Sequence, residues 1–256
     1  PGQLQLKGKL AAPNLYLAGP SSNGNSINAP AEAIAKVPQQ KKEGWDLLKV
    51  HPGLTREEYD AMARTAREET MRFGGHVPAD VGLLHAIEMG QETFDHLDGY
   101  VEYVEGDEKK LADIVKRSKS AGVWVVPTMA LWEVLYGTLD LKTLRNYEEL
   151  KYVPQSAVDN WTKLYNQRLD DIARDEAESV VKQRLRILEA LNDGGVKILM
   201  GTDAPQQFSV PGFSLHRELQ WMRRAGMSPY EILVSGTRNV GEYFANEDSF
   251  GTIEKG

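Results

Sequence analysis

Four polar side chains stand where predicted strands of this sequence end. Lys49 closes the segment Trp-Asp-Leu-Leu-Lys, His76 closes Phe-Gly-Gly-His, His96 closes Thr-Phe-Asp-His, and Asp203 closes Ile-Leu-Met-Gly-Thr-Asp. In a parallel α/β barrel the carboxyl ends of the strands meet at one mouth, so residues far apart in the chain would converge there. Imidazole nitrogens and carboxylate oxygens bind zinc at roughly 2.0 to 2.2 Å. The four positions therefore predict a metal site.

Each of these residues, taken singly, also has a structural explanation. A lysine at a strand end is usually a solvated charge or an ion-pair partner, and a histidine there is more often a hydrogen-bonded structural residue. An aspartate after Gly-Thr frequently caps the next helix. Four such residues at successive strand ends are hard to obtain from packing or capping alone, and their combination favours the metal site.

The elements that would position these residues alternate between strand and helix. We expect strands at 14–18, 45–50, 75–77, 93–97, 123–127 and 198–201, and helices at 55–72, 80–89, 107–121, 157–193 (one or two), 215–224 and 229–240. Thr55 with Glu58 predicts a capping box, Ser228 an N-cap, and residues 131–156 an insertion. The alternation predicts a parallel α/β fold.

Six strands are fewer than a closed barrel requires. The expected fold is therefore a partial (β/α)₈ TIM barrel, a single catalytic domain over residues 1–256 in which strands 3 to 8 are present. Unpaired edges would otherwise be exposed, so we expect the first two strands to precede Pro1.

Composition narrows the class of partner. With 256 residues and 41% hydrophobic residues the chain is long enough for one large domain, and its net charge of -7 argues against a nucleic-acid partner. No apolar run approaches the roughly 18 residues that span a bilayer, so no membrane partner is expected. The absence of cysteine excludes thiolate ligands and a cysteine nucleophile. We expect a small-molecule substrate; the compartment and the oligomeric state, a homo-oligomer included, stay open.

Several motifs of the chain resemble the amidohydrolase superfamily, and within it the imidazolonepropionase-like and Xaa-Pro dipeptidase-like members. The resemblance covers nearly the whole chain and is most specific at the Gly-Thr-Asp strand end and the closing stretch, which in the family leads into an accessory β-sandwich that this chain would lack. The motifs are Gly44-Trp-Asp-Leu-Leu-Lys49, Gly75-His76, Phe94-Asp95-His96, Gly201-Thr-Asp203-Ala, His216-Arg-Glu-Leu, Ala225-Gly-Met-Ser-Pro, Gly236-Thr-Arg-Asn and Phe250-Gly-Thr-Ile-Glu-Lys-Gly.

The resemblance implies a binuclear hydrolase that cleaves an amide bond, peptide-like or cyclic, with a metal-bound hydroxide. Lys49 would be the carboxylated lysine that bridges two divalent ions, expected to be zinc, because an unmodified ammonium has no lone pair to offer. His76 and His96 would bind the more exposed ion. Asp203 would bind the other ion and serve as the catalytic general base.

One departure from the family pattern is plain. The first two ligands of the family form a His-x-His pair, and the histidines at 51, 76, 85, 96 and 216 contain no such spacing. We expect the pair to belong to the missing first strands, and this chain alone to bind metal weakly and to be inactive. The alternatives are a noncatalytic barrel fragment or binding module, a lactone or organophosphate esterase on the same site, and a mononuclear deaminase-like enzyme, against which Lys49 argues.

Further candidates are weaker. Tyr100 and His216 are candidates for substrate contact, whereas His85 is interpreted as structural and His51 as a turn residue that could still reach the mouth. Four aromatic residues in two loops either shape an apolar substrate pocket or pack on the barrel rim; they are Trp132, Tyr136, Phe208 and Phe213.

Overall fold

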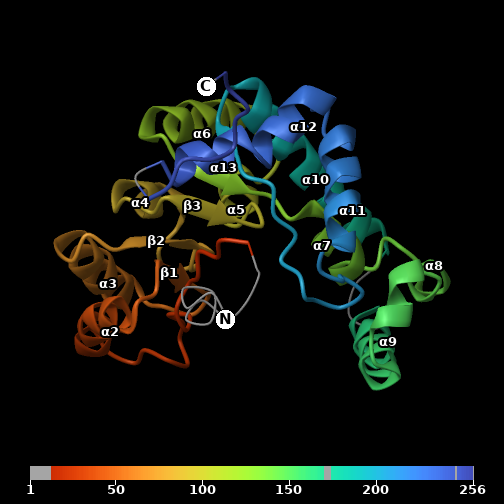
Figure 1. Cartoon of the computed structure of the whole chain (residues 1–256), viewed down its shortest axis with the longest axis horizontal. Helices are drawn as coiled ribbons and strands as arrows, with labels where there is room; N and C mark the ends of the chain where they lie inside the picture. The colour runs from red at the N-terminus through yellow and green to blue at the C-terminus, as the bar shows by residue number, and fades with distance from the viewer. Residues whose placement is uncertain (1–12, 170–173, 246, 256) are drawn as a thin grey trace. The chain divides into compact units, whose positions relative to one another are not determined.

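The computed structural model describes residues 13–169, 174–245 and 247–255 (Figure 1). The chain divides into two compact units, Pro1–Glu92 and Thr93–Gly256. In each unit the strands pair in parallel and are joined by helices, which confirms the predicted parallel α/β class. A single catalytic domain over 1–256 stays a prediction.

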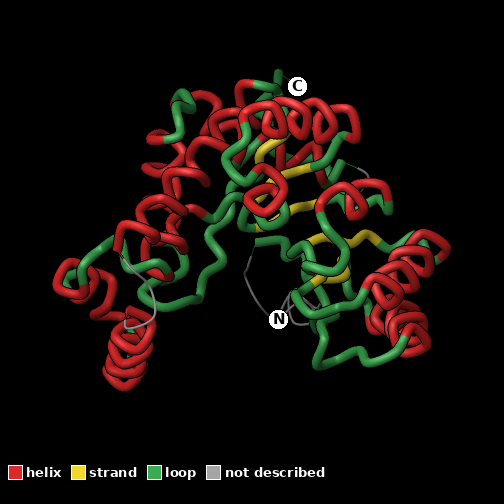
Figure 2. Tube along the Cα trace, turned by 180° about the vertical axis from the view of Figure 1, so that it is seen from behind, coloured by secondary structure: helices red, strands yellow, loops and turns green. Residues whose placement is uncertain are grey.

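The first unit has two strands and three helices. Strand β1 (Leu47–Val50) pairs in parallel with β2 (Arg72–Gly75). Helices α2 (Pro30–Glu43) and α3 (Arg56–Glu68) lie side by side in both Figure 1 and Figure 2, and α4 (Leu83–Glu88) follows β2. Helix α2 was not predicted, although it begins on a proline at its first turn and ends at Gly44 in the left-handed conformation.

The prediction of a strand at 14–18 is wrong. The described chain forms only two isolated parallel bridges beside β1 in this region, Ala18 with Leu47 and Ser22 with Val50. The Gly19 and Ser22 amides donate to the Leu47 and Lys49 carbonyls at 3.0 and 2.8 Å. Pro20 lies between the two bridges and has no N–H to donate, so a continuous ladder cannot form.

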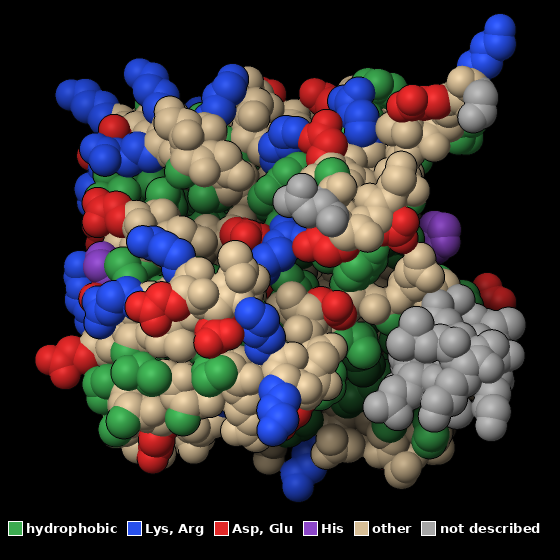
Figure 3. Space-filling view, turned by 60° about the vertical axis from the view of Figure 1, so that its left-hand side comes forward, with side chains coloured by type: hydrophobic (Ala, Val, Ile, Leu, Met, Phe, Trp, Pro, Cys, Tyr) green, Lys and Arg blue, Asp and Glu red, His purple; other side chains and the backbone are tan. Residues whose placement is uncertain are grey.

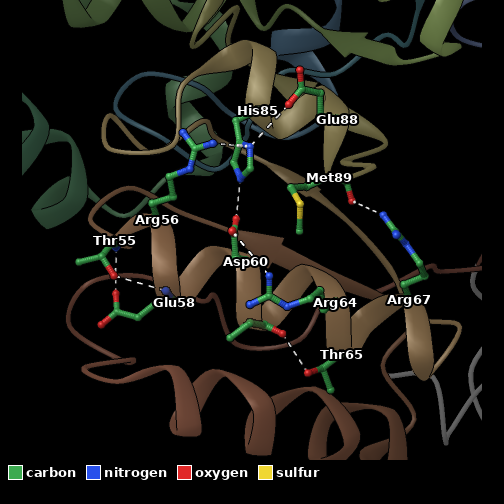
Figure 4. A network of polar contacts seen from close by, with 11 residues as sticks. Thr55, Arg56, Glu58, Asp60, Arg64, Thr65, Arg67, His85, Glu88 and Met89 are labelled. Atoms are coloured by element: carbon green, nitrogen blue, oxygen red, sulfur yellow. Dashed lines mark hydrogen bonds and ion pairs between the residues drawn. The ribbon is translucent and has the colours of Figure 1, made fainter.

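The capping box predicted at the start of α3 is confirmed (Figure 4). The backbone N–H of Thr55 donates to the Glu58 carboxylate at 2.9 Å, and the Glu58 N–H donates to the Thr55 hydroxyl at 3.4 Å. Two of the N–H groups that a helix start leaves without a partner are thereby satisfied.

Removing this cap is expected to destabilise the fold. We predict that Thr55→Ala lowers the free energy of unfolding by about 0.5 to 2 kcal/mol, because the Glu58 N–H loses its acceptor. Urea unfolding followed by circular dichroism measures the change. The matched control is Thr55→Ser, which keeps the hydroxyl; an equal loss in both variants would show that the hydroxyl is not the stabilising group.

His85 fastens α4 to α3, in agreement with its structural interpretation. Its Nε2 lies 2.5 Å from the Asp60 carboxylate, and its Nδ1 lies 2.7 Å from the Arg56 guanidinium (Figure 4). Because guanidinium can only donate, Nδ1 accepts and Nε2 carries the proton that bonds to Asp60. One tautomer of the ring is thereby fixed between two helices.

The second unit is built on strands β3 (Thr93–Asp95), β4 (Trp124–Val126) and β5 (Lys197–Ile198), with β4 paired in parallel to both others. The helices are α5 (Tyr100–Val104), α6 (Glu108–Ala121), α10 (Arg174–Asp193), α11 (Phe213–Arg224), α12 (Pro229–Ser235) and α13 (Arg238–Tyr243). Ser228 caps α12 as predicted. The single helix expected over 229–240 is interrupted at Gly236 and Thr237.

The predicted insertion is helical. Residues 131–156 form most of α7 (Met129–Leu135), all of α8 (Leu141–Arg145) and the 3₁₀ helix η1 (Glu148–Tyr152), and the start of α9 (Gln155–Leu169). Helices α8 and α9 project from the rest of this unit in both Figure 1 and Figure 2. A buried cluster holds them, and its members are Val134, Leu144, Val158, Tyr165 and Phe208. The expected helical region 157–193 is therefore two helices, α9 and α10.

On the face shown in Figure 3, Lys and Arg side chains are interspersed with Asp and Glu. Phosphate binding needs a concentrated basic face, and this face offers none. Among the described helices, none combines the length and the apolar character needed to cross a membrane.

Candidate metal centre

In the first unit, the candidates Lys49 and His76 lie on neighbouring strands. Lys49 is the third residue of β1 and is paired with Gly74, while His76 follows β2 directly and donates its backbone N–H to the Val50 carbonyl at 3.1 Å. Both side chains are partly buried. The two residues therefore sit at the carboxyl ends of adjacent parallel strands, as predicted.

Gly75 makes room between these strands. Its φ is 128°, and a Cβ at this position would lie 2.3 Å from the Val50 carbonyl oxygen and 3.1 Å from Cδ of Lys49. A backbone oxygen cannot withdraw from such a clash, so glycine is required where β2 passes the Lys49 side chain.

His51 is closer to the candidate site than its turn position suggested. Its ring centroid lies 4.4 Å from that of His76, with the ring planes at 61°. The signal was present in the sequence, because residues two apart in an extended chain point to the same side and His51 is two residues after Lys49. His51 thus joins the neighbours of His76.

In the second unit, His96 is held from two sides. It follows β3 directly, its backbone N–H donates to the Val126 carbonyl at 2.8 Å, and its side chain is buried at 3% exposure. Nδ1 shares a 2.7 Å hydrogen bond with Oγ1 of Thr128, which is also buried. The imidazole is therefore oriented by a neighbouring strand end, as histidine ligands of metals usually are.

Asp203 lies on the loop that follows β5. It is exposed, and its Oδ2 accepts a hydrogen bond from the Gln206 side chain at 3.1 Å. The preceding Thr202 places its hydroxyl 3.2 Å from that of Ser214, the second residue of α11. The start of α11 thus borders the loop that carries Asp203.

Three loops of this unit share a strained backbone. His96, Thr128 and Asp203 have φ values of 64°, 47° and 56°, although none of them is glycine. Left-handed conformations of this kind cost about 1 to 2 kcal/mol per residue and persist only where the surroundings enforce them. Such residues follow three successive strands. At these strand ends the backbone keeps a conformation that is locally unfavourable, and that conformation sets the direction of each side chain.

The donor chemistry of the candidates suits a divalent metal. His76 and His96 offer imidazole nitrogen, Asp203 offers carboxylate oxygen, and Lys49 would have to be carboxylated before it could bind. Lys49 and His76 belong to the first unit, and His96 and Asp203 to the second. Within the described ranges, no three His, Asp or Glu side chains gather into a metal-binding group.

The two candidates for substrate contact differ in their surroundings. Tyr100 is fully buried, its hydroxyl lies 2.8 Å from that of Ser118, and burial raises its pKa. This environment favours packing over the predicted substrate contact. His216 is exposed on α11 and lines a cavity of about 470 Å³ together with Glu133, Tyr147, Glu149, Arg217 and Trp221. Contact with a ligand stays a prediction for His216.

The four aromatic candidates also differ in their surroundings. Trp132 packs edge to face against His96, with ring centroids 6.2 Å apart, and stacks on Tyr136 at 5.3 Å. The buried Arg184 guanidinium lies 3.8 Å from the Trp132 ring centroid. Phe213 is 41% exposed, whereas Phe208 is only 1% exposed and belongs to the cluster under the insertion, so Phe208 packs rather than shapes a pocket.

Sequence reasoning missed Glu218 as a candidate. Its carboxylate is 0% exposed and accepts the backbone N–H groups of Met129 and Ala130 at 2.9 and 2.8 Å. Burial, outweighing these two hydrogen bonds, raises the pKa of Glu218 to about 7. The residue lies in the quoted His216-Arg-Glu-Leu motif, but nothing in that motif indicates a partner almost ninety positions away.

The raised pKa predicts a pH dependence of stability. The folded carboxyl titrates near 7, against a usual 4.5, so between these values the folded chain binds the proton more tightly than the unfolded chain. Lowering the pH through this window therefore adds stability from this group, up to about 3 kcal/mol, and the contribution is lost as the pH rises again. Urea unfolding of the wild type and of Glu218→Gln, measured between about pH 5 and about pH 7.5, tests this. Equal pH slopes in the two proteins would contradict it.

Comparison with known proteins identifies the chain's relatives. No curated protein sequence matches it. Among solved structures, a bottromycin amidohydrolase superposes with a TM-score of 0.77 at 22% identity, covering 96% of this chain and 59% of the other. A Xaa-Pro dipeptidase with bound methionine in its active site gives 0.67 at 22% identity, covering 99% and 63%. The ochratoxinase of A. niger gives 0.61 at 19% identity, covering 90% and 47%.

These likenesses show a shared fold, and the chain spans about half to two thirds of the length of these relatives. The model of the amidohydrolase family matches residues 9–256. Since that match includes nearly every position, together with all four strand-end candidates, the chain belongs to the amidohydrolase family.

Proposed function

We propose that this chain is the barrel portion of a metal-dependent hydrolase that cleaves an amide bond, with Lys49, His76, His96 and Asp203 as metal ligands. The observation that carries the proposal is the family match over residues 9–256, which includes all four candidates. Their positions at or after parallel strands support it. In this proposal the bridged segment around Ala18 and Ser22, followed by β1 to β5, takes the positions of strands 3 to 8 of a (β/α)₈ barrel.

Each ligand has a stated role in the proposal. Carboxylated Lys49 would bridge two divalent ions, expected to be zinc, and His76 and His96 would bind the more exposed ion. When bound, such ions lower the pKa of water and polarise the scissile carbonyl. Asp203 would accept a proton from the attacking water as the new C–O bond forms, and would pass it to the leaving nitrogen as the C–N bond breaks. The products are a carboxylic acid and an amine, which exchange a proton to give carboxylate and ammonium.

The substrate class follows from the relatives only as a proposal. One related structure is named a Xaa-Pro dipeptidase and another a bottromycin amidohydrolase. We infer that the substrate is a dipeptide, an N-acyl amino acid or a cyclic amide. Lactones and organophosphate esters could be attacked by the same activated water, and they serve as the competing class in the test.

Metal analysis of the purified chain tests the site. We expect zinc or cobalt to bind with an affinity that falls at least about tenfold in His76→Gln, His96→Gln and Lys49→Ala, since each variant removes one ligand. Asp80→Asn, at an exposed turn, is the control and should bind as the wild type does. Equal binding by the wild type and the His76→Gln/His96→Gln double variant would overturn the ligand assignment. Initial rates on a panel of dipeptides, lactones and phosphotriesters, measured with protein that also carries a His-x-His pair, then separate amide from ester hydrolysis.

A further inference from the structure

Helix α11 presents two buried polar side chains one turn apart. Ser214 and Glu218 are 1% and 0% exposed, and residues four apart lie on one face of a helix. Ser214 reaches Thr202, the residue before Asp203, and Glu218 reaches the amides of Met129 and Ala130. One helix face thus contacts two of the loops that follow strands of this unit.

The backbone that Glu218 contacts is adjacent to the hydrogen-bond partner of His96. Met129 follows Thr128, whose hydroxyl lies 2.7 Å from Nδ1 of the His96 ring. Thr128 is a β-branched residue at φ 47°, a conformation that it would leave if its neighbours did not hold it. The two hydrogen bonds that Glu218 accepts fix the peptide units that follow Thr128, and so fix where the Thr128 hydroxyl points.

A second carboxylate connects α7 and α11, but this one belongs to α7 and its hydrogen-bond donor belongs to α11. Glu133 of α7 accepts the indole N–H of Trp221 of α11 at 2.8 Å, and both side chains are buried. The two helices are therefore connected near both ends of α7. Glu133 lies four residues beyond the start of α7 and accepts an indole N–H of α11 rather than a backbone N–H beside Thr128, so it offers an internal comparison for Glu218.

We propose that Glu218 is a positioning residue for His96: through the Met129 and Ala130 amides it holds Thr128 in the strained conformation that orients the imidazole of His96. The inference rests on the proposed function in that His96 is taken as a metal ligand. A carboxylate that merely capped α7 would stabilise the helix and would leave the ring of His96 unaffected.

Nitrogen-15 NMR of histidine-labelled protein measures the ring directly, without metal or substrate. The chain has five histidines, and the ring signals of His96 are identified as those that the His96→Gln variant lacks. We expect Glu218→Gln, which keeps the shape and loses one acceptor, to shift the His96 ring signals while those of His85 stay in place. Thr128→Val should reproduce the shift, and the double variant should add little to either, because both changes interrupt one path.

Metal affinity gives the second measurement. In a zinc competition titration, Glu218→Gln is expected to bind about 10-fold to 100-fold more weakly, as for other partners that orient a ligand. Glu133→Gln is the matched control and should lower stability with less than about a twofold change in affinity. If Glu218→Gln lowers stability but leaves the His96 signals and the affinity as in Glu133→Gln, the positioning role is wrong.

Failure of the proposed function would look different. If His96→Gln binds zinc as the wild type does, His96 is not a ligand, yet the ring signals would still show whether Glu218 orients it. If Glu218→Gln does not fold, Thr128→Val decides the matter: an unchanged His96 ring in that variant overturns the proposal.

Discussion

Replacing Asp203 with asparagine is expected to lower kcat for amide hydrolysis by about 10² to 10⁴-fold, the usual contribution of a general base. The substitution keeps the size of the side chain and its contact with Gln206, which lies 3.1 Å away. It removes the negative charge that would bind a metal and the site that would accept the proton. Because this chain contains no His-x-His pair, the loss is measured by initial-rate kinetics on the best amide of the panel with protein that also carries such a pair, at saturating metal.

The matched control for Asp203→Asn is Asp80→Asn, the same chemical change at an exposed turn, for which we expect wild-type kcat. The pattern of the loss is also diagnostic. A fall in kcat with little change in KM indicates a group that acts mainly in the transition state. A kcat within about threefold of the wild type for Asp203→Asn would contradict the assignment of general base.

The second large effect is expected on stability. We predict that Phe208→Ala lowers the free energy of unfolding by about 3 to 5 kcal/mol, because it leaves a cavity in a closed cluster. Phe208 is 1% exposed, packs with Val134, Leu144, Val158 and Tyr165, and lies 5.6 Å from the Trp161 ring. Calorimetry or urea unfolding gives the value.

Phe213→Ala provides the comparison, since it makes the same change five residues along the chain. Phe213 is 41% exposed and stacks on Tyr152, at 5.8 Å between ring centroids. Its loss should cost less than about 1 kcal/mol, in keeping with surface substitutions. Equal losses for the two variants would show that the cluster does not anchor the loop after Asp203.

Local signals in the sequence predicted a large part of the fold. Thr55 and Ser228 marked helix starts correctly, because capping depends on residues three positions apart. The strands ending near His76 and His96 were located within a few residues, because each is bounded by turn residues. Helix α2 was missed although Pro30 and Gly44 mark its ends, since its apolar residues are few.

The remaining features depend on contacts distant in sequence. Glu218 and Met129 are 89 residues apart, and no periodicity connects them. The burial of Tyr100 against Ser118 and of Phe208 beneath the insertion likewise follows from tertiary packing, which local patterns do not report. The ligand assignments stay predictions, because donor chemistry and strand position restrict which residues could bind a metal but do not bring them together.

The outer helices of the insertion can change in evolution without a change in the strands of the sheet. Helix α9 packs on both α7 and α8, and among the buried members of their cluster only Phe208 lies outside these three helices. Exchange or lengthening of α8 and α9 would leave the register of β3, β4 and β5 untouched. Descendants of one ancestral gene could therefore acquire different outer segments over the same strand ends, with selection acting on a few anchoring side chains.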